Sequence, residues 1–295
     1  MSGKSITQIA RHDRIRREVL TRSDMIPSLP EVVTEVLRLL DEPDSDIHVF
    51  EAPLAKDAAL VAKMLKLVNS AFFGVGRPVT TIADAVVILG VRSLRSMVLA
   101  TSTANLLERD FGCYGHDRKG LWQHSLAVAA ASRKMAELLK FDKDIREEMF
   151  VAGLLHDIGK MLLSPYFAED DIDVAATGRP ACEVEREILG IDHQEAGAII
   201  AENWKLSALV QSVLRSHHED GSSEEHQSVI SMVRLADTCA HNVGYGYRPD
   251  ARQDRHPASE DLARLGLDAE RWAEMGPDIR AAMENAIEAL GRLGE

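Results

Sequence analysis

Residues 150–163 read FVAGLLHDIGKMLL, an apolar run that is interrupted mainly by one histidine-aspartate pair. Apolar residues continue on both sides of His156 and Asp157, so we expect the pair inside a buried helix over residues 143–162. A carboxylate that leaves water needs a partner to offset its lost hydration. A divalent cation is one such partner, and ordinary hydrogen bonding in the core is the simpler alternative for a single buried histidine.

The same dipeptide occurs at two other places in the chain, so the dipeptide alone is weak evidence. His12-Asp13 and His116-Asp117 lie in charged or glycine-rich surroundings. We expect both of these pairs to be solvated at the surface. The same expectation applies to four further histidines in polar segments: His48, His226, His241 and His256.

The rest of the chain shows helical rather than strand patterning. In DAALVAKMLKLVNSAFF, residues 57–73, the apolar side chains of Leu60, Met64, Leu67 and Val68 share one helical face. Aromatic residues make up only 5% of the 295 residues, and long stretches consist of good helix formers such as Ala, Leu, Glu, Arg and Lys. We find no convincing strand pattern and no internal repeat. The sequence therefore predicts an all-α, multi-helical bundle.

Changes in patterning divide the chain into four predicted regions. Residues 1–22 are charged and weakly patterned, which indicates an N-terminal arm or a frayed helix. The helical pattern lapses around residues 111–120, which separates an N-terminal helical subdomain (23–110) from a second subdomain (111–245). A segment rich in Gly, Arg and Pro then begins a linker with C-terminal helices (246–295).

Charge and composition narrow the functional classes. The formal net charge of −13 argues against general electrostatic binding to nucleic acid. No apolar run approaches the roughly 20 residues that span a bilayer, and the N-terminal residues are too polar for a secretory signal. The three cysteines form no paired motif, which fits a reducing, cytoplasmic environment: Cys113, Cys182 and Cys239.

Other side chains of the metal-ligating type fall on helices predicted around the central pair. His124 stands near the start of a helix that would pack beside the His-Asp helix in a short-loop hairpin. Asp237 lies inside a mostly apolar segment, His193 begins another helix, and His217 and His218 end the next one. Any one of these residues alone is more simply structural. Imidazoles and carboxylates from several helices are together typical of an iron, manganese or zinc site in a helical bundle.

The order of these residues resembles that of a known family. His124, then His156-Asp157, then Asp237 is similar to the H…HD…D pattern of HD-domain phosphohydrolases. The resemblance covers roughly residues 23–245 and identifies the chain as similar to bacterial HDOD proteins, a signalling branch of the same superfamily. Three N-terminal segments carry the HDOD resemblance: IPSLPEVV, KDAALVAKMLKLVNSAFFG and TTIADAVVILGVRSLRSMVL.

The resemblance implies a centre for one or two divalent ions of iron, manganese or zinc. Asp157 would bridge the two positions, and the HD-GYP branch uses equivalent histidines for its second ion. Lys160 follows His156 by one helical turn and would neutralise a phosphate oxygen, unless it is a surface lysine at a helix end. Asp157 and Lys160 are thus the residues expected to take part in chemistry. Seven residues are the implied metal ligands: His124, His156, Asp157, His193, His217, His218 and Asp237.

Two departures from the HD-GYP pattern bear on activity. The GYP sequence is replaced by MLLSPYFAED, and Gly120 stands where some of those enzymes supply a glutamate for a third metal. We therefore expect a signal-transduction module with a bound metal, a signalling protein partner and a phosphoester or nucleotide ligand. The alternative is an active metal-dependent phosphohydrolase. A closed site would favour a structural metal, whereas open coordination positions would favour chemistry.

Overall fold

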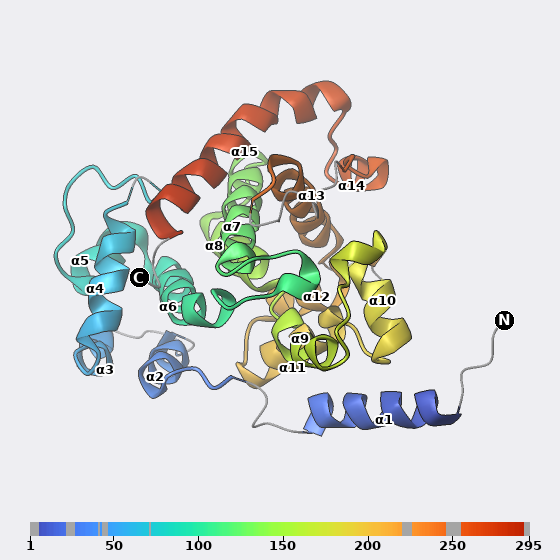
Figure 1. Cartoon of the computed structure of the whole chain (residues 1–295). Coiled ribbons are helices and arrows are strands. Elements are labelled where there is room, and N and C mark those ends of the chain that lie inside the picture. Colours follow the sequence, from blue (N-terminus) through green and yellow to red (C-terminus); the bar gives the residue numbers. More distant parts are fainter. Residues whose placement is uncertain are drawn as a thin grey trace.

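Helices form throughout the part of the chain that the structure describes, and no strand or sheet occurs there (Figure 1). The all-α prediction is therefore confirmed. An isolated antiparallel bridge between Phe111 and His116 closes one short loop. None of the described helices is long and apolar enough to cross a bilayer. The computed structural model describes residues 6–21, 27–40, 42, 47–70, 72–219, 226–245 and 255–291.

The N-terminal group of helices forms where capping residues precede apolar stripes of helical period. Asp57 accepts a hydrogen bond from the backbone N–H of Leu60, and Thr81 caps the following helix in the same way. The stripe that the sequence predicts, ending at Leu67 and Val68, is buried. These helices lie together at one side of the molecule, in blue and cyan (Figure 1). The group contains α2 (Glu31–Leu40), η1 (Ile47–Phe50), α3 (Glu51–Leu54), α4 (Ala58–Val68), α5 (Ile82–Leu89) and α6 (Val91–Leu107).

A second group is built around the hairpin of α7 (Gly120–Leu138) and α8 (Lys143–Leu155), which pack against each other as expected. Gly153 permits this close approach, because a Cβ atom there would lie 2.8 Å from the Cα atom of Ala129. The other elements of the group surround this hairpin. They are η2 (Gly112–Tyr114), α9 (Lys160–Glu169), η3 (Ala175–Thr177), α10 (Ala181–Ile188), α11 (His193–Asn203), α12 (Ala208–Ser216) and α13 (Gln227–Val243).

The predicted continuous helix over residues 143–162 is wrong, because α8 ends at Leu155 and α9 begins at Lys160. A tight turn joins the two helices and contains the His-Asp pair. Within it, the backbone N–H of Lys160 donates to the carbonyl oxygen of Asp157 at 3.0 Å. Gly159 in this turn lies against α11, and a Cβ atom there would clash with the backbone of that helix. The turn therefore brings the pair directly against α11.

The N-terminal helix α1 (Ile6–Thr21) packs on the second group of helices. His12 is buried against Gly190, which corrects the expectation that it is solvated. Arg16 forms an ion pair with Glu195 on α11. The burial of His12 thus arises from tertiary packing that the charged local sequence does not reveal.

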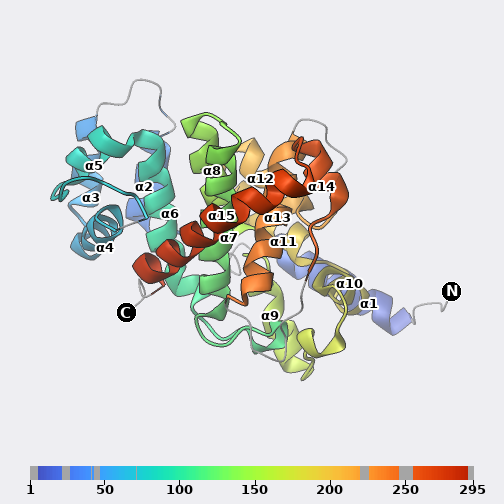
Figure 2. The ribbon, with the colours of Figure 1, turned by 90° about the horizontal axis from the view of Figure 1, so that it is seen from above.

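Two further helices, α14 (Ser259–Arg264) and α15 (Ala269–Leu290), complete the fold. α15 lies across α7 (Figure 2), where the Nε1–H group of Trp122 donates to the carbonyl oxygen of Leu290 at 3.2 Å. The boundaries of the four predicted regions stay predictions. Most of the linker proposed after residue 245, residues 246–254, lies outside the described residues.

Candidate metal centre

Asp157 lies at the centre of a buried cluster that α7, the turn after α8, and α13 supply on one side. Its Oδ2 atom is 3.3 Å from Nε2 of His156 and 3.7 Å from Nε2 of His124. These three residues each offer a ligand atom, and the three atoms lie within 4.8 Å of one another. Asp237 on α13 reaches the group through His124, with Oδ1 3.1 Å from Nε2. One cation could contact this first group.

A second group shares Asp157 and is supplied by α11 and the end of α12. The Oδ1 atom of Asp157 is 3.4 Å from Nε2 of His193 and 3.8 Å from Nε2 of His217. The ring of His218 completes the group at its exposed edge, 4.3 Å from the ring centroid of His217. The structure thus brings the histidines of this second group around the second carboxylate oxygen of Asp157.

Hydrogen bonds on the far side of each ring orient three of these histidines. Nδ1 of His156 faces a backbone carbonyl at 2.8 Å, and Nδ1 of His217 faces two carbonyls at 3.2 Å. Nδ1 of His193 faces the carboxylate of Glu185 at 2.7 Å. Because these oxygens only accept, a neutral ring carries its proton on Nδ1 and presents the lone pair of Nε2 toward Asp157.

The donor set fits a divalent cation. Nε2 of His156 and Oδ1 of Asp157 are buried and make no hydrogen bond within the residues that the structure describes. Such atoms cost free energy when they are left without a partner. Imidazole nitrogens and carboxylate oxygens are ligands that iron, manganese and zinc accept. A cation at this position would satisfy the converging lone pairs.

The electrostatic environment keeps the carboxylates ionised and several imidazoles neutral. Burial would raise the pKa of Asp157, but Lys160 and His156 hold it well below the usual value. Burial also opposes the ionised form of Asp237, yet hydrogen bonding to His124 and nearby positive charge lower its pKa well below normal. Burial lowers the pKa of His124 and lowers that of His217 to about 4. Ionised Asp157 and Asp237 and neutral His124 and His217 are the protonation states that metal binding requires, whereas the neighbouring Asp157 raises the pKa of His156 despite its burial.

Two cationic side chains pair with the carboxylates of the cluster. Nζ of Lys160 is 2.6 Å from Oδ2 of Asp157, and the side chain is buried. The alternative that Lys160 is a surface lysine is therefore wrong. Nη1 of Arg255 is 3.0 Å from Oδ2 of Asp237. Asn242 fixes the backbone of Arg255 with two hydrogen bonds of 2.7 Å, and no sequence signal indicated this contact.

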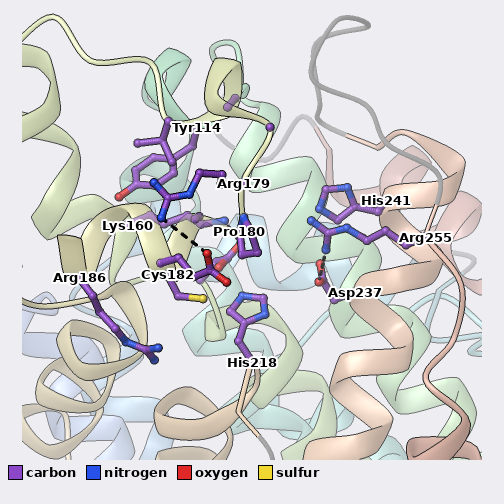
Figure 3. Close-up of a pocket in the computed structure, with 16 residues that line it drawn as sticks. Tyr114, Lys160, Arg179, Pro180, Cys182, Arg186, His218, Asp237, His241 and Arg255 are labelled. Atoms are coloured by element: carbon purple, nitrogen blue, oxygen red, sulfur yellow. Dashed lines mark hydrogen bonds and ion pairs between the residues drawn. The ribbon is translucent and has the colours of Figure 1, made fainter. Parts of the chain in front are cut away.

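An open pocket of about 660 Å³ lies over the cluster (Figure 3). Asp157, His218 and Asp237 line it, together with cationic side chains from separate parts of the chain. Figure 3 shows Arg255 and His241 beside Asp237, with Lys160 and Arg179 across the pocket from them. The cluster is therefore accessible to a ligand. The cationic lining residues are Lys160, Arg179, Arg186 and Arg255.

Two buried histidines near the cluster contradict the expectation that they lie at the surface. The ring of His116 is 5.6 Å from that of His124, and the ring of His241 is 5.7 Å away on another side. His241 follows Asp237 by one helical turn, so helical spacing is a signal that could have placed it here. His116 lies in a glycine-rich loop, which offers no such signal.

The remaining histidine expectations have mixed outcomes. His256 is exposed as predicted. His226 is only partly buried, and its Nδ1 lies 2.9 Å from the hydroxyl of Ser212. The side chain of His48 lies outside the described residues. Neither His226 nor His256 belongs to either group around Asp157.

Comparisons with known proteins agree with the all-helical fold. The model of the HDOD domain family matches residues 26–220. A candidate phosphohydrolase from Shewanella amazonensis is 26% identical, with a TM-score of 0.73 over 95% of this chain and 97% of that chain. An HDOD domain protein of unknown function from Geobacter sulfurreducens is also 26% identical, with a TM-score of 0.71 over 95% and 98% of the two chains.

A curated relative extends well beyond the matched segment. An uncharacterised protein of Treponema pallidum is 28% identical over 228 residues, which is 76% of this chain and 44% of the relative. The chain thus spans less than half the length of that relative.

Proposed function

Because the chain belongs to the HDOD domain family, we propose that it is a signal-transduction module that binds a phosphate-containing ligand at a divalent-metal centre. One observation carries the proposal. The histidine-aspartate cluster lies beneath an open pocket of about 660 Å³ that cationic side chains line. A metal with a purely structural role is normally closed off by protein ligands, so access from solvent favours ligand binding.

We assign the ligands to two positions that share Asp157. His156, His124 and Asp237 would complete the first position. His193, His217 and His218 would complete the second position, with Asp157 as the bridge. Bound divalent ions would attract phosphate oxygens and lower the pKa of a bound water. The full proposed set is His124, His156, Asp157, His193, His217, His218 and Asp237.

The cationic residues of the pocket support a phosphate-bearing ligand. Lys160 contacts Asp157 through its ammonium group, which has three N–H donors in all. Arg255 contacts Asp237 through one guanidinium nitrogen, and the planar group has five N–H donors. Both side chains therefore keep donors that can face an anion. Charge-assisted hydrogen bonds of this kind are strong and suit phosphate oxygens.

A second candidate function, hydrolysis of a phosphoester, is favoured by the same open access to Asp157. Lys160 would then neutralise charge on the phosphoryl group. The placement of a substrate changes the reaction rate by large factors. Here the residues after the His-Asp turn continue as α9 in place of a GYP segment. We therefore propose little or no turnover of cyclic dinucleotides, and ligand binding as the main role.

The N-terminal helices are the proposed contact surface for a signalling protein. The described helices of residues 30–107, α2 to α6, lie at one side of the molecule, away from the pocket-lining helix α10 (Figure 1). Val87 on α5 is 70% exposed, which is unusual for a large apolar side chain in this structure. A single exposed apolar side chain is common at protein surfaces, so the proposal rests on the separation of these helices from the pocket.

The test combines metal analysis with an activity screen. Protein purified without added metal is analysed for iron, manganese and zinc, and is then incubated with cyclic dinucleotides, cyclic mononucleotides and a chromogenic phosphodiester. His156→Ala and Asp157→Ala serve as controls for the centre. Stoichiometric metal with little turnover supports the binding role, whereas robust turnover that both variants abolish supports hydrolysis. Absence of metal, with a thermal midpoint that a chelator does not change, contradicts both.

A further inference from the structure

Glu185 is a buried carboxylate on α10 that contacts the cluster from behind. Its side chain is 0% exposed. Its Oε2 atom lies 2.7 Å from Nδ1 of His193 and accepts a hydrogen bond of 2.9 Å from the backbone N–H of the same residue. Two contacts from one oxygen atom therefore fix both the backbone and the ring of His193.

The consequence of this contact reaches the centre of the cluster. With its proton held on Nδ1, the ring of His193 directs Nε2 to a position 3.4 Å from Asp157 and 3.3 Å from Nε2 of His217. The corresponding Nδ1 atoms of His156 and His217 face neutral backbone carbonyls. His193 is thus the member of this trio that has an acidic partner, and a carboxylate partner raises the basicity of an imidazole ligand.

The start of α11 does not depend on Glu185 for its cap. Asp192 is the N-cap residue, and its side chain accepts a hydrogen bond of 2.9 Å from the backbone N–H of Glu195. Burial and the nearby charge of Glu185 raise the pKa of the Tyr114 hydroxyl well above the usual value. The contact with His193 is therefore the polar contact of Glu185 that bears on the cluster.

We propose that Glu185 is a positioning residue that sets the orientation and basicity of His193 as a metal ligand. This inference rests on the proposed function, because it requires that the second group around Asp157 binds a divalent ion. Glu185 acts on the ion through His193 and is not itself a ligand. Loss of its negative charge should therefore weaken the second position and leave the first position, at His124 and His156, intact.

The test measures Mn²⁺ affinity by calorimetric titration of the full chain after treatment with a chelator. Glu185→Gln keeps an oxygen that can accept from the backbone N–H of His193 but removes the charge. We expect the dissociation constant of one Mn²⁺ ion to weaken by about 10- to 100-fold, the usual effect of losing such a partner. Glu147→Gln is the matched control, because Glu147 is equally buried but pairs with Arg133 instead of a candidate ligand.

The outcomes separate this inference from the proposed function. Wild-type protein that binds no Mn²⁺ overturns both. Wild-type protein that binds Mn²⁺, with an unchanged dissociation constant in E185Q, overturns the role of Glu185 alone. An equal loss in E147Q would show a general effect of removing a buried charge and would also overturn it. If E185Q does not fold, Glu185→Asp tests the contact instead of the charge, because the shorter side chain withdraws the carboxylate from His193 and should weaken binding; an unchanged dissociation constant in E185D would overturn the role of Glu185.

Discussion

Asp157 belongs to both groups of candidate ligands and also neutralises the buried ammonium group of Lys160. Asp157→Ala should therefore lose metal and should also destabilise the metal-free protein. Leaving a buried charge without its partner costs about 3 kcal/mol. Urea unfolding with and without chelator measures both effects. Asp117→Ala, which removes an exposed carboxylate from another His-Asp dipeptide, is the control.

The two contributions of Asp157 can be told apart by this experiment. If D157A loses stability only in the presence of metal, the pairing with Lys160 contributes nothing. If D157A keeps stoichiometric metal, the assignment of Asp157 as the shared ligand is wrong.

The neutral buried histidines predict how stability depends on pH. Burial lowers the pKa of His217 to about 4 and that of His241 to about 3, from 6.5. Between these values and pH 6.5 the unfolded chain binds more protons, so stability falls as the pH falls. The neighbouring Asp157 raises the pKa of His156 despite its burial, which acts in the opposite direction. Burial also lowers the pKa of His124, so stability is still expected to fall as the pH falls.

Unfolding of chelator-treated protein in urea, at a series of pH values from neutral to about 4, checks this trend. We expect a progressive loss of stability that begins near pH 6.5. A variant with His217→Asn and His241→Asn should show a flatter dependence. Constant stability across this range would contradict the neutral, buried state of both rings.

The candidate ligands could be selected from sequence because each is of a metal-ligating type and lies at a definite place on a predicted helix. Their shared position could not be derived in the same way, since it depends on how the helices pack. Lys160 shows most clearly what the sequence cannot predict, because its spacing from His156 is the same whether its side chain is exposed or paired with Asp157. Glu185 and Arg255 act across tertiary contacts, and nothing in their local sequence indicates this.

Close packing between helices controls the geometry of the His-Asp turn. Gly159→Ala should destabilise the protein by about 1–3 kcal/mol, the usual cost of overpacking, because its Cβ atom would lie 2.6 Å from the backbone nitrogen of Gly197. Gly197→Ala is the matched control, since its Cβ atom would meet neighbours only at 3.6 Å or more. Thermal unfolding of both variants measures the difference. Equal stability of G159A and wild type would mean that α11 can shift without cost.

The helices themselves were largely predictable, because apolar residues recur with helical period in most of them. The break at the His-Asp turn was missed for the same reason. Leu155, Ile158 and Leu162 continue the apolar pattern through residues that do not form one helix, and all three are buried. The turn is stabilised by contact with α11, which lies far away in sequence. Local periodicity cannot report such a contact.

The last helix, α15, is part of the common core of the molecule and contributes to its stability. Ile279 on α15 is 1% exposed, and α15 packs against α7. Ile279→Ala should therefore cost about 2–5 kcal/mol, the range for truncating a buried isoleucine. Asp278→Ala, next to it on the exposed face, should change stability by no more than about 0.5 kcal/mol. Chemical unfolding would contradict the role of α15 if both variants behaved alike.

The contribution of α13 and Arg255 to the pocket has a consequence for how such a protein can be recombined. The segment that matches the family model ends at residue 220, whereas Asp237, His241 and Arg255 follow it. A gene fusion that transferred only the matched segment would lose Asp237, one of the two candidate carboxylate ligands, and the helices α13 and α15 that pack on α7. The heritable unit that carries the proposed metal centre is therefore longer than the segment that sequence similarity defines, and exchange between genomes should preserve both together.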